Sequence, residues 1–327
     1  MSVRMCLLAV LLVSSTACRN AEDSDPAIPN NTNITITVSG LSSGGYMAGQ
    51  LHVAHSELIS GVGILAAGPY RCSDGKLMQA LSACVSGEGL VVDDLVASTI
   101  SSADAGRLDA LDNLTMDRVW IYHGSQDSVV DESVSAAAVE SYRSLGIDSS
   151  AIRFVKDIPS THGFPTLQSD IPCDVMQSPF VNGCDYDAAG EMLQFLVQSS
   201  DVLPVDATGQ LSVFEQNANG AGLLPEGYIY RPAQCKDREC DLHIVLHGCA
   251  QNATLVGDAI AKTAGYNRWA DALNLVVIYP QAAANAMTNP LGCWDWWGYT
   301  GPDYATQDGP QVKALHAIIM RYQQGKL

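Results

Sequence analysis

One serine in a glycine-rich stretch is the residue of this sequence best suited to covalent chemistry. Residues 40–45 are Gly-Leu-Ser-Ser-Gly-Gly, so Ser42 occupies the centre of a Gly-x-Ser-x-Gly pattern. Small residues on both sides permit a sharp turn between a strand and a helix, which lifts a serine hydroxyl above a sheet. Ser42 is therefore the predicted nucleophile. The alternative is an ordinary Gly/Ser-rich loop, since such short matches also occur by chance.

A nucleophilic serine needs a base and an acid that orients the base. Asp127 and His162 each follow a predicted strand, in the Ser, Asp, His order typical of α/β-hydrolases. Asp131 is the other acidic candidate, but it is better placed to cap the next helix. Of the seven histidines, His162 is the one in a loop after the next strand, bounded by glycine and proline. His123 ends a strand too close to Asp127 to be a separate base.

The negative charge that forms on the attacked carbonyl oxygen needs hydrogen-bond donors. The backbone N–H of Ser43, directly after the nucleophile, is one expected donor. The second normally comes from a His-Gly loop that precedes the nucleophile, but here His-Gly-Cys lies far downstream, at residues 247–249. This order predicts a circularly permuted chain, which is feasible because the ends of a domain often lie close together. The alternative is a buried histidine in a turn.

The elements that would position these residues alternate between strand and helix. Before residue 200 we predict strands at 34–38, 61–67, 119–123 and 152–155, with helices at 46–55, 131–145 and 188–198. After it we predict antiparallel strands at 210–214 and 228–230, buried strands at 242–246 and 275–279, and helices at 259–272 and 312–322. This alternation predicts one α/β domain with a mostly parallel sheet covered on both faces. A boundary near residue 200 would divide it, but the second half has no nucleophile of its own.

Composition excludes several classes of function. The 327 residues are 47% hydrophobic and 16% charged, which is typical of a globular protein. The formal net charge is −18 and lysine and arginine form no cluster, so nucleic acid is not an expected partner. A neutral substrate fits better than an anionic one.

The first residues form a targeting segment. Arg4 precedes a short apolar run and then small residues up to Cys18, as in a secretory signal at residues 1–18. Ala17-Cys18 also resembles a lipoprotein box, although Ser15 stands where leucine is usual. Soluble export and a lipid anchor on Cys18 both remain open. Residues 19–33 are a predicted polar tether, and residues 34–327 the catalytic domain.

The cysteines agree with export. Ten cysteines less Cys6 and Cys18 leave eight, and an even number in an exported chain predicts disulfides. The sequence contains no Cys-x-x-Cys spacing, so the cysteines do not indicate a metal site. Eight cysteines allow 105 connectivities, and pairing of neighbours is the simplest. The expected bonds are Cys72–Cys84, Cys173–Cys184, Cys235–Cys240 and Cys249–Cys293.

These features together resemble extracellular poly(3-hydroxybutyrate) depolymerases of the circularly permuted, single-domain kind. The resemblance rests on residues 40–46, the Asp127 and His162 loops, residues 246–249, and a Tyr-Pro-Gln followed by Cys-Trp-Asp-Trp-Trp at 293–297. It implies Ser42, Asp127 and His162 as a catalytic triad. It also implies the amides of Ser43 and Cys249 as oxyanion donors, with no cofactor.

The resemblance further implies a hydrophobic polyester or oligoester substrate and a monomeric enzyme. The expected substrate-site residues are Tyr46, His247, Trp294, Trp296 and Trp297, with Trp297 the preferred contact and simple packing the alternative. Many bacterial relatives carry a separate polymer-binding domain, whereas we expect adsorption here to use the surface of the catalytic domain itself. Two other functions remain: a carboxylesterase for feruloyl or other phenolic esters, and an exported polymer-binding protein without catalysis.

Overall fold

The computed structural model describes residues 34–217 and 220–327. The predicted signal segment, the tether and the lipidation site at Cys18 lie outside the described residues, so those expectations remain predictions. In the described part no helix has both the length and the apolar character needed to cross a membrane.

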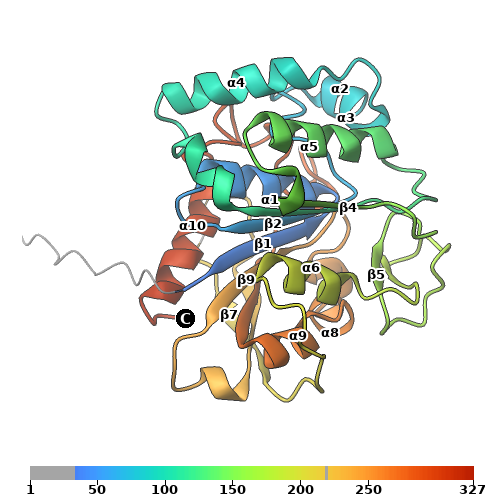
Figure 1. Ribbon diagram of the computed structural model, residues 1–327, viewed down its shortest axis with the longest axis vertical. Helices are drawn as coiled ribbons and strands as arrows, with labels where there is room; N and C mark the ends of the chain where they lie inside the picture. The colour runs from blue at the N-terminus through green and yellow to red at the C-terminus, as the bar shows by residue number, and fades with distance from the viewer. Residues whose placement is uncertain (1–33, 218–219) are drawn as a thin grey trace, which may run out of the picture. The chain divides into compact units, whose positions relative to one another are not determined.

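An eight-stranded sheet runs through both halves of the described chain, in the order β4-β3-β2-β1-β9-β10-β8-β7 (Figure 1). The first six strands in that order are parallel to one another, and β8 pairs antiparallel with both β10 and β7. The strands are β1 (Ile36–Leu41), β2 (Gly61–Leu65), β3 (Arg118–Tyr122), β4 (Ile152–Val155), β7 (Gln210–Glu215), β8 (Glu226–Arg231), β9 (Asp241–Leu246) and β10 (Leu275–Tyr279). The predicted fold class is thus confirmed.

The neighbours of β1 come from opposite ends of the chain. On one edge β1 pairs with β2, and on the other with β9, so that Ile36 lies opposite Leu242. The separation is large: the Thr35 N–H donates to the Asp241 carboxylate across 206 residues. The strand that precedes the His-Gly turn therefore lies directly beside the strand that precedes Ser42, as the permuted order requires.

Helices cover both faces of the sheet (Figure 1). One face packs on α1 (Ser43–Ala54), α4 (Val92–Asp104), α5 (Glu132–Ser144) and α10 (Pro310–Gln323). The other packs on α6 (Ala188–Leu196), α8 (Ala259–Thr263) and α9 (Tyr266–Leu273). Alternate residues of a strand serve the two cores, since successive side chains point to opposite faces. Val276 and Ile278 join the first core, and Leu275 and Val277 the second.

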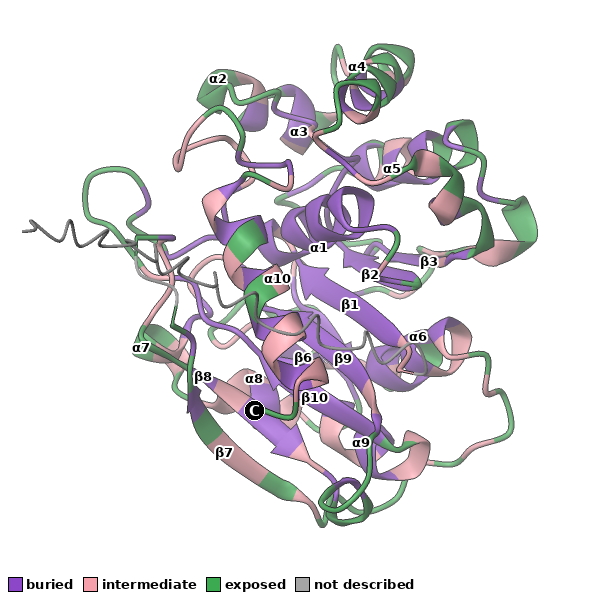
Figure 2. Ribbon diagram, turned by 90° about the vertical axis from the view of Figure 1, so that its left-hand side faces the viewer, coloured by how far each residue is buried: buried purple, intermediate pink, exposed green. Residues whose placement is uncertain are grey.

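Several elements differ from the prediction. Helix α1 begins three residues earlier than expected and is buried along its whole length, as Figure 2 shows. The helix expected at 259–272 is two helices, because Gly265 adopts φ 90° between α8 and α9. Helix α4 was not predicted. The remaining short elements are α2 (Leu77–Ala80), α3 (Ala83–Ser86), β5 (Phe164–Thr166), β6 (Val181–Gly183) and α7 (Ala253–Val256).

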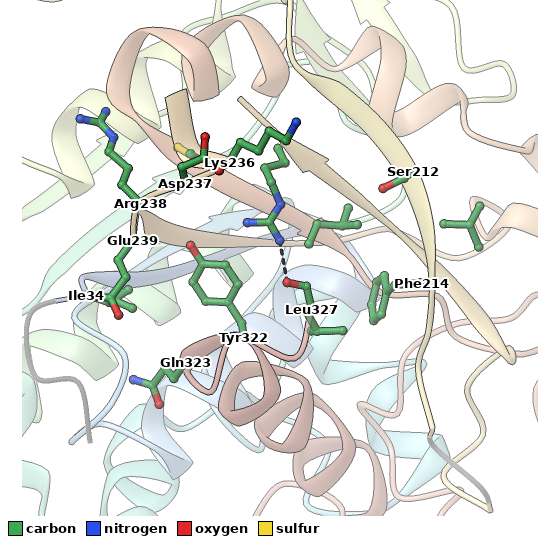
Figure 3. A pocket seen from close by; sticks show the side chains of 15 residues that line it. Ile34, Ser212, Phe214, Lys236, Asp237, Arg238, Glu239, Tyr322, Gln323 and Leu327 are labelled. Atoms are coloured by element: carbon green, nitrogen blue, oxygen red, sulfur yellow. Dashed lines mark hydrogen bonds between the residues drawn. The ribbon is translucent and has the colours of Figure 1, made fainter. Parts of the chain in front are cut away.

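The first and last described residues approach the same hollow. Ile34 and Leu327 both line a pocket of about 730 Å³, and an Arg231 guanidinium N–H donates to the Leu327 carbonyl at 2.7 Å (Figure 3). The pocket lies by the start of β1 and β9, whereas Ser42 follows the end of β1. This proximity makes the permuted connectivity sterically simple.

Candidate active site

Ser42 occupies the turn between β1 and α1. Its backbone has φ 55° and ψ −121°, a conformation that non-glycine residues rarely adopt. Such a residue costs on the order of 1–3 kcal/mol and persists only where its surroundings enforce it. Here the Ser42 N–H donates to the Leu65 carbonyl at 2.8 Å, and the Ser42 carbonyl accepts the first helical bond from Tyr46. This is the geometry of a nucleophile elbow, with the serine half-exposed.

The two flanking glycines are required by close backbone contacts. A Cβ on Gly40 would lie 2.2 Å from the Gly44 carbonyl oxygen, so the elbow could not fold back on itself. A Cβ on Gly44 would lie 2.2 Å from the Leu246 carbonyl oxygen, at the end of β9. The second contact shows that the end of β9 presses directly on the elbow.

Asp127 and His162 form a hydrogen-bonded pair. His162 Nδ1 and Asp127 Oδ2 are 2.7 Å apart, and the Asp127 side chain is fully buried whereas that of His162 is 12% exposed. The other Asp127 oxygen accepts the N–H groups of Val129 and Val130. Burial acts to raise the pKa of Asp127, but the hydrogen bond and charge of His162, with these two amides, outweigh it and lower the pKa. Asp127 is therefore held as an anion beside the imidazole.

The acidic and basic loops are joined by backbone hydrogen bonds. The Ser125 N–H donates to the Ile158 carbonyl, and the Gln126 N–H to that of Ser160. Asp131, the other acidic candidate, instead accepts the Ser133 N–H and caps α5. The structure thus gives the two carboxylates different roles.

The His162 loop also reaches the elbow. Phe164, two residues after His162, lines one small internal cavity together with Leu41, which precedes Ser42, and with His247. The carboxyl ends of β1, β3 and β4 and the turn after β9 therefore converge. Among residues 34–217 and 220–327, no group of three or more His, Cys, Asp or Glu side chains could hold a metal ion.

Both ring nitrogens of His247 form hydrogen bonds with backbone groups. Its Nε2 accepts the Ala282 N–H at 3.1 Å, so the proton lies on Nδ1, which donates to the Gly248 carbonyl at 2.7 Å. Burial lowers the pKa of His247 to about 4, which keeps the ring neutral. The Gly248 carbonyl and the Cys249 N–H belong to the same peptide, and in a trans peptide these two groups point in opposite directions. Since the carbonyl points toward the His247 ring, the Cys249 N–H points away from it.

Two amides are thereby available to an oxyanion. The Cys249 N–H has no hydrogen-bond partner within the described ranges. Ser43 is the first residue of α1, where an N–H lacks a preceding helical carbonyl. The Gly44 contact with the end of β9 brings the two segments together.

The tryptophan segment is attached to both of these segments. All four expected disulfides are present, and the Cys249–Cys293 bond joins the His-Gly-Cys turn to the start of the Cys-Trp-Asp-Trp-Trp run. The next residue, Trp294, donates its N–H to Ser43 Oγ at 3.3 Å.

A continuous group of aromatic rings follows. Tyr46 stacks on Trp296 with centroids 4.5 Å apart, Trp296 meets Trp297 edge-on at 5.8 Å, and Trp297 contacts Tyr299 at 4.8 Å. We call Tyr46, Trp296, Trp297 and Tyr299 the aromatic wall.

Burial divides the five residues expected at the substrate site. Trp296 and Trp297 are half-exposed. Trp294 is fully buried and packs on the His247 ring, while His247 and Tyr46 are 3% and 5% exposed. Trp294, His247 and Tyr46 therefore present little surface to a bound molecule and contact Trp296 or one another instead. Contact with substrate thus remains a prediction for Trp296 and Trp297.

Sequence reasoning missed Asp295, which lies between the tryptophans. It is fully buried, and its carboxylate accepts hydrogen bonds from residues 297–300. Its place within an aromatic block was the available signal, but a loop aspartate is usually solvated.

Comparisons with known proteins agree with this geometry. No protein-family model matches the chain. A poly(3-hydroxybutyrate) depolymerase of Delftia acidovorans is 38% identical over 301 residues, which cover 88% of this chain and 60% of that protein. The chain therefore spans less than two thirds of the length of that relative. A polyhydroxybutyrate depolymerase of Talaromyces funiculosus is 33% identical over 325 residues, covering 93% of this chain and 94% of the relative.

Solved structures give the same result. A serine-to-alanine variant of PHB depolymerase complexed with R3HB trimer matches with a TM-score of 0.81 and 29% identity, over 90% of this chain and 96% of that one. The PHB depolymerase from Penicillium funiculosum matches with a TM-score of 0.80 and 30% identity, over 87% and 95% of the two chains. With more than 30% identity to the Talaromyces protein over nearly the full length of both sequences, the chain belongs to the polyhydroxybutyrate depolymerase family.

Proposed function

We propose that this protein is a serine esterase that hydrolyses poly(3-hydroxybutyrate), or a related hydroxyalkanoate polyester, through an acyl-enzyme. The observation that carries the proposal is the strained elbow at Ser42 in the same edge of the sheet as the Asp127–His162 pair. The Delftia relative is larger than this chain, so its activity supports the proposal only through the shared part.

The mechanism follows from the hydrogen bonds of the pair. Since His162 Nδ1 faces Asp127, Nε2 is the nitrogen left to accept the Ser42 proton. Ser42 Oγ then attacks the ester carbonyl, and the amides of Ser43 and Cys249 stabilise the oxyanion. His162 returns the proton to the departing alcohol. Water completes the cycle by the same route, and Asp127 stabilises the imidazolium in both halves.

The surroundings of the elbow suit a neutral ester chain. Trp296 and Trp297 offer half-exposed apolar rings against which methyl and methylene groups can pack. The net charge of −18 would repel an anionic polymer. A phenolic ester also suits aromatic rings, but both relatives and both solved structures are polyhydroxybutyrate depolymerases.

The decisive experiment compares substrates with and without the nucleophile. The wild-type protein should release 3-hydroxybutyrate monomer and dimer from amorphous polymer and show little activity on methyl ferulate. Ser42→Ala should lose about a million-fold in turnover, as triad deletions do. Ser39→Ala, on the preceding strand, is the matched control for loss of a buried hydroxyl. Preference for methyl ferulate, or unchanged activity of Ser42→Ala, would contradict the proposal.

We also infer export. The four disulfides are typical of a protein that matures outside the cytosol. Soluble release and lipid attachment at Cys18 give mature N-terminal peptides of different mass, which mass spectrometry distinguishes.

A further inference from the structure

The Asp295 carboxylate collects an unusual number of hydrogen bonds for a buried acid. One oxygen accepts the N–H groups of Trp297, Gly298 and Tyr299, at 3.3, 2.7 and 3.0 Å. The other accepts the N–H and the hydroxyl of Thr300, at 2.7 and 2.6 Å. The side chain is fully buried and makes no ion pair within the described residues. The carboxylate is therefore compensated entirely by this one turn of chain.

This arrangement fixes the course of the backbone. An ionised carboxyl group is an acceptor only, so every donor must point toward it. Burial raises the pKa of Asp295, whereas its bonds to Thr300, Tyr299 and Gly298 act in the opposite direction. A buried charge is costly unless hydrogen-bonded, so any path of residues 297–300 that withdraws these donors is disfavoured.

The backbone of Asp295 is itself anchored to the core. Its N–H donates to Gln311 Oε1 of α10 at 2.7 Å, and its carbonyl accepts from Gln50 Nε2 of α1 at 2.9 Å. Both glutamines are 1% exposed or less. Asp295 therefore connects the core to a half-exposed loop: its backbone binds α1 and α10, and its carboxylate binds residues 297–300.

That loop contains two rings of the aromatic wall and adjoins a third. Trp297 and Tyr299 donate their own amides to Asp295, and Trp296 is its direct neighbour in the chain. All three rings are half-exposed, and the Tyr299 ring is also held by its hydroxyl, which donates to the Cys293 carbonyl at 2.8 Å and accepts from the side chains of Gln311 and Asn289. Packing alone does not fix Trp296 and Trp297. Their orientation depends on the backbone beneath them.

We propose that Asp295 is a positioning residue that sets the aromatic wall and so determines the preference for extended neutral esters over short ones. This inference rests on the proposed function for the identity of the extended ester. A short ester ends near the scissile bond, whereas a polyester chain continues past it onto the wall. Loss of the carboxylate should therefore impair long substrates selectively.

The test compares Asp295→Asn with wild type on three substrates: amorphous poly(3-hydroxybutyrate), the soluble 3-hydroxybutyrate trimer and p-nitrophenyl butyrate. We expect the variant to lose about three- to tenfold on polymer and to raise KM for the trimer similarly, the size of one misplaced aromatic contact. p-Nitrophenyl butyrate hydrolysis should change less than twofold. Trp297→Ala is the benchmark for a missing ring and should show the same split. Near-UV circular dichroism should show reduced tryptophan signals for Asp295→Asn.

Two further variants separate positioning from general loss of stability. Asp187→Ala removes a carboxylate that accepts two hydrogen bonds, from Gly190 N–H and Trp269 Nε1, at the start of α6. It should lower Tm without any substrate split. Thr300→Val removes only the hydroxyl donor and should give a smaller split than Asp295→Asn, and it serves as the test if Asp295→Asn does not fold.

The outcomes distinguish the two proposals. If wild type cleaves p-nitrophenyl butyrate but neither the polymer nor the trimer, the proposed substrate is wrong, and the near-UV signals of Asp295→Asn and Thr300→Val then decide the positioning role. Equal losses on all substrates, or an unaltered near-UV spectrum in both variants, would overturn the role of Asp295.

Discussion

On one side of Ser42 the proposed catalytic side chains meet through one hydrogen bond between loops that backbone hydrogen bonds join, and on the other side a disulfide and a long-range hydrogen bond tie the segments together. Asp127 and His162 lie 35 residues apart and meet through one 2.7 Å contact between adjacent loops. The opposite side joins Ser43 to Trp294 across 251 residues and adds the Cys249–Cys293 disulfide.

These two kinds of attachment suit different parts of the proposed mechanism. In the proposed mechanism the His162 imidazole exchanges a proton twice in each cycle, so its partner has to stabilise both of its charge states. The proposed oxyanion donors and the aromatic wall would have to stay still, because preorganised dipoles stabilise a transition state best when they need no rearrangement. Changes on the first side should therefore alter chemistry steeply, and changes on the second should act through geometry.

The largest effect should come from the acid. Asp127→Asn keeps the size of the side chain but removes the charge and favours the wrong imidazole tautomer, so kcat should fall about 10⁴-fold. Asp131→Ala, which removes the α5 cap, should instead cost about 1 kcal/mol of stability and leave kcat unchanged. Steady-state kinetics with p-nitrophenyl butyrate and thermal melts measure both. A loss of kcat in Asp131→Ala as large as that in Asp127→Asn would reverse the assignment.

An intermediate effect should follow loss of the covalent cross-link. In the Cys249→Ser, Cys293→Ser double variant the Cys249 amide is freer to move, and kcat should fall about tenfold, below the 10²–10³-fold typical of losing an oxyanion donor outright. Cys235→Ser with Cys240→Ser removes a disulfide beside the pocket of Figure 3. That control should lower Tm but not kcat. If both pairs change kcat equally, the cross-link has no special relation to the site.

The last effect concerns the pH dependence of stability and not turnover. Because the pKa of His247 is lowered to about 4, the unfolded chain binds a proton on this residue between about pH 6.5 and pH 4 that the folded chain does not. Stability should therefore fall as pH drops through this window. His247→Gln should make that slope shallower by up to ~1.4 kcal/mol per pH unit. Urea unfolding at several pH values measures the slope, and an unchanged slope would show that His247 titrates normally in the folded protein.

The sequence best predicted the features that depend on residues close together in the chain. Strands such as β2, β3 and β10 follow from apolar runs, and the cap that Asp131 forms on α5 follows from its distance to that helix. The order of functional residues along the chain predicted the permuted connectivity, because a His-Gly turn after a strand has few other uses.

What the sequence could not supply depends on long-range packing. Helix α4 lacks a clear apolar pattern because two of its four buried residues, Thr99 and Ser102, are polar, whereas the apolar Ile100 is exposed. The break at Gly265 needs a left-handed residue whose conformation the spacing of apolar residues does not report. Trp294 and Trp297 have the same chemistry, but Trp294 packs in the core and against the His247 ring, whereas Trp297 stays half-exposed. The hydrogen bonds of Asp295 come from the three-dimensional path of its own loop.

The pairing of β1 with β9 also has a consequence for how the chain acquires its structure. Strand β1 leaves the ribosome early, whereas its partner follows 206 residues later, so the apolar edge of β1 stays unpaired until most of the protein has been made. Contacts of such large sequence separation slow folding, and an uncovered strand edge invites association with other chains. The end of β9 also lies directly against Gly44 of the elbow, so the proposed active site cannot form stepwise from the amino end of the chain. Synthesis of the last third of the chain is thus the event that would complete the proposed site, whose nucleophile is encoded in the first third.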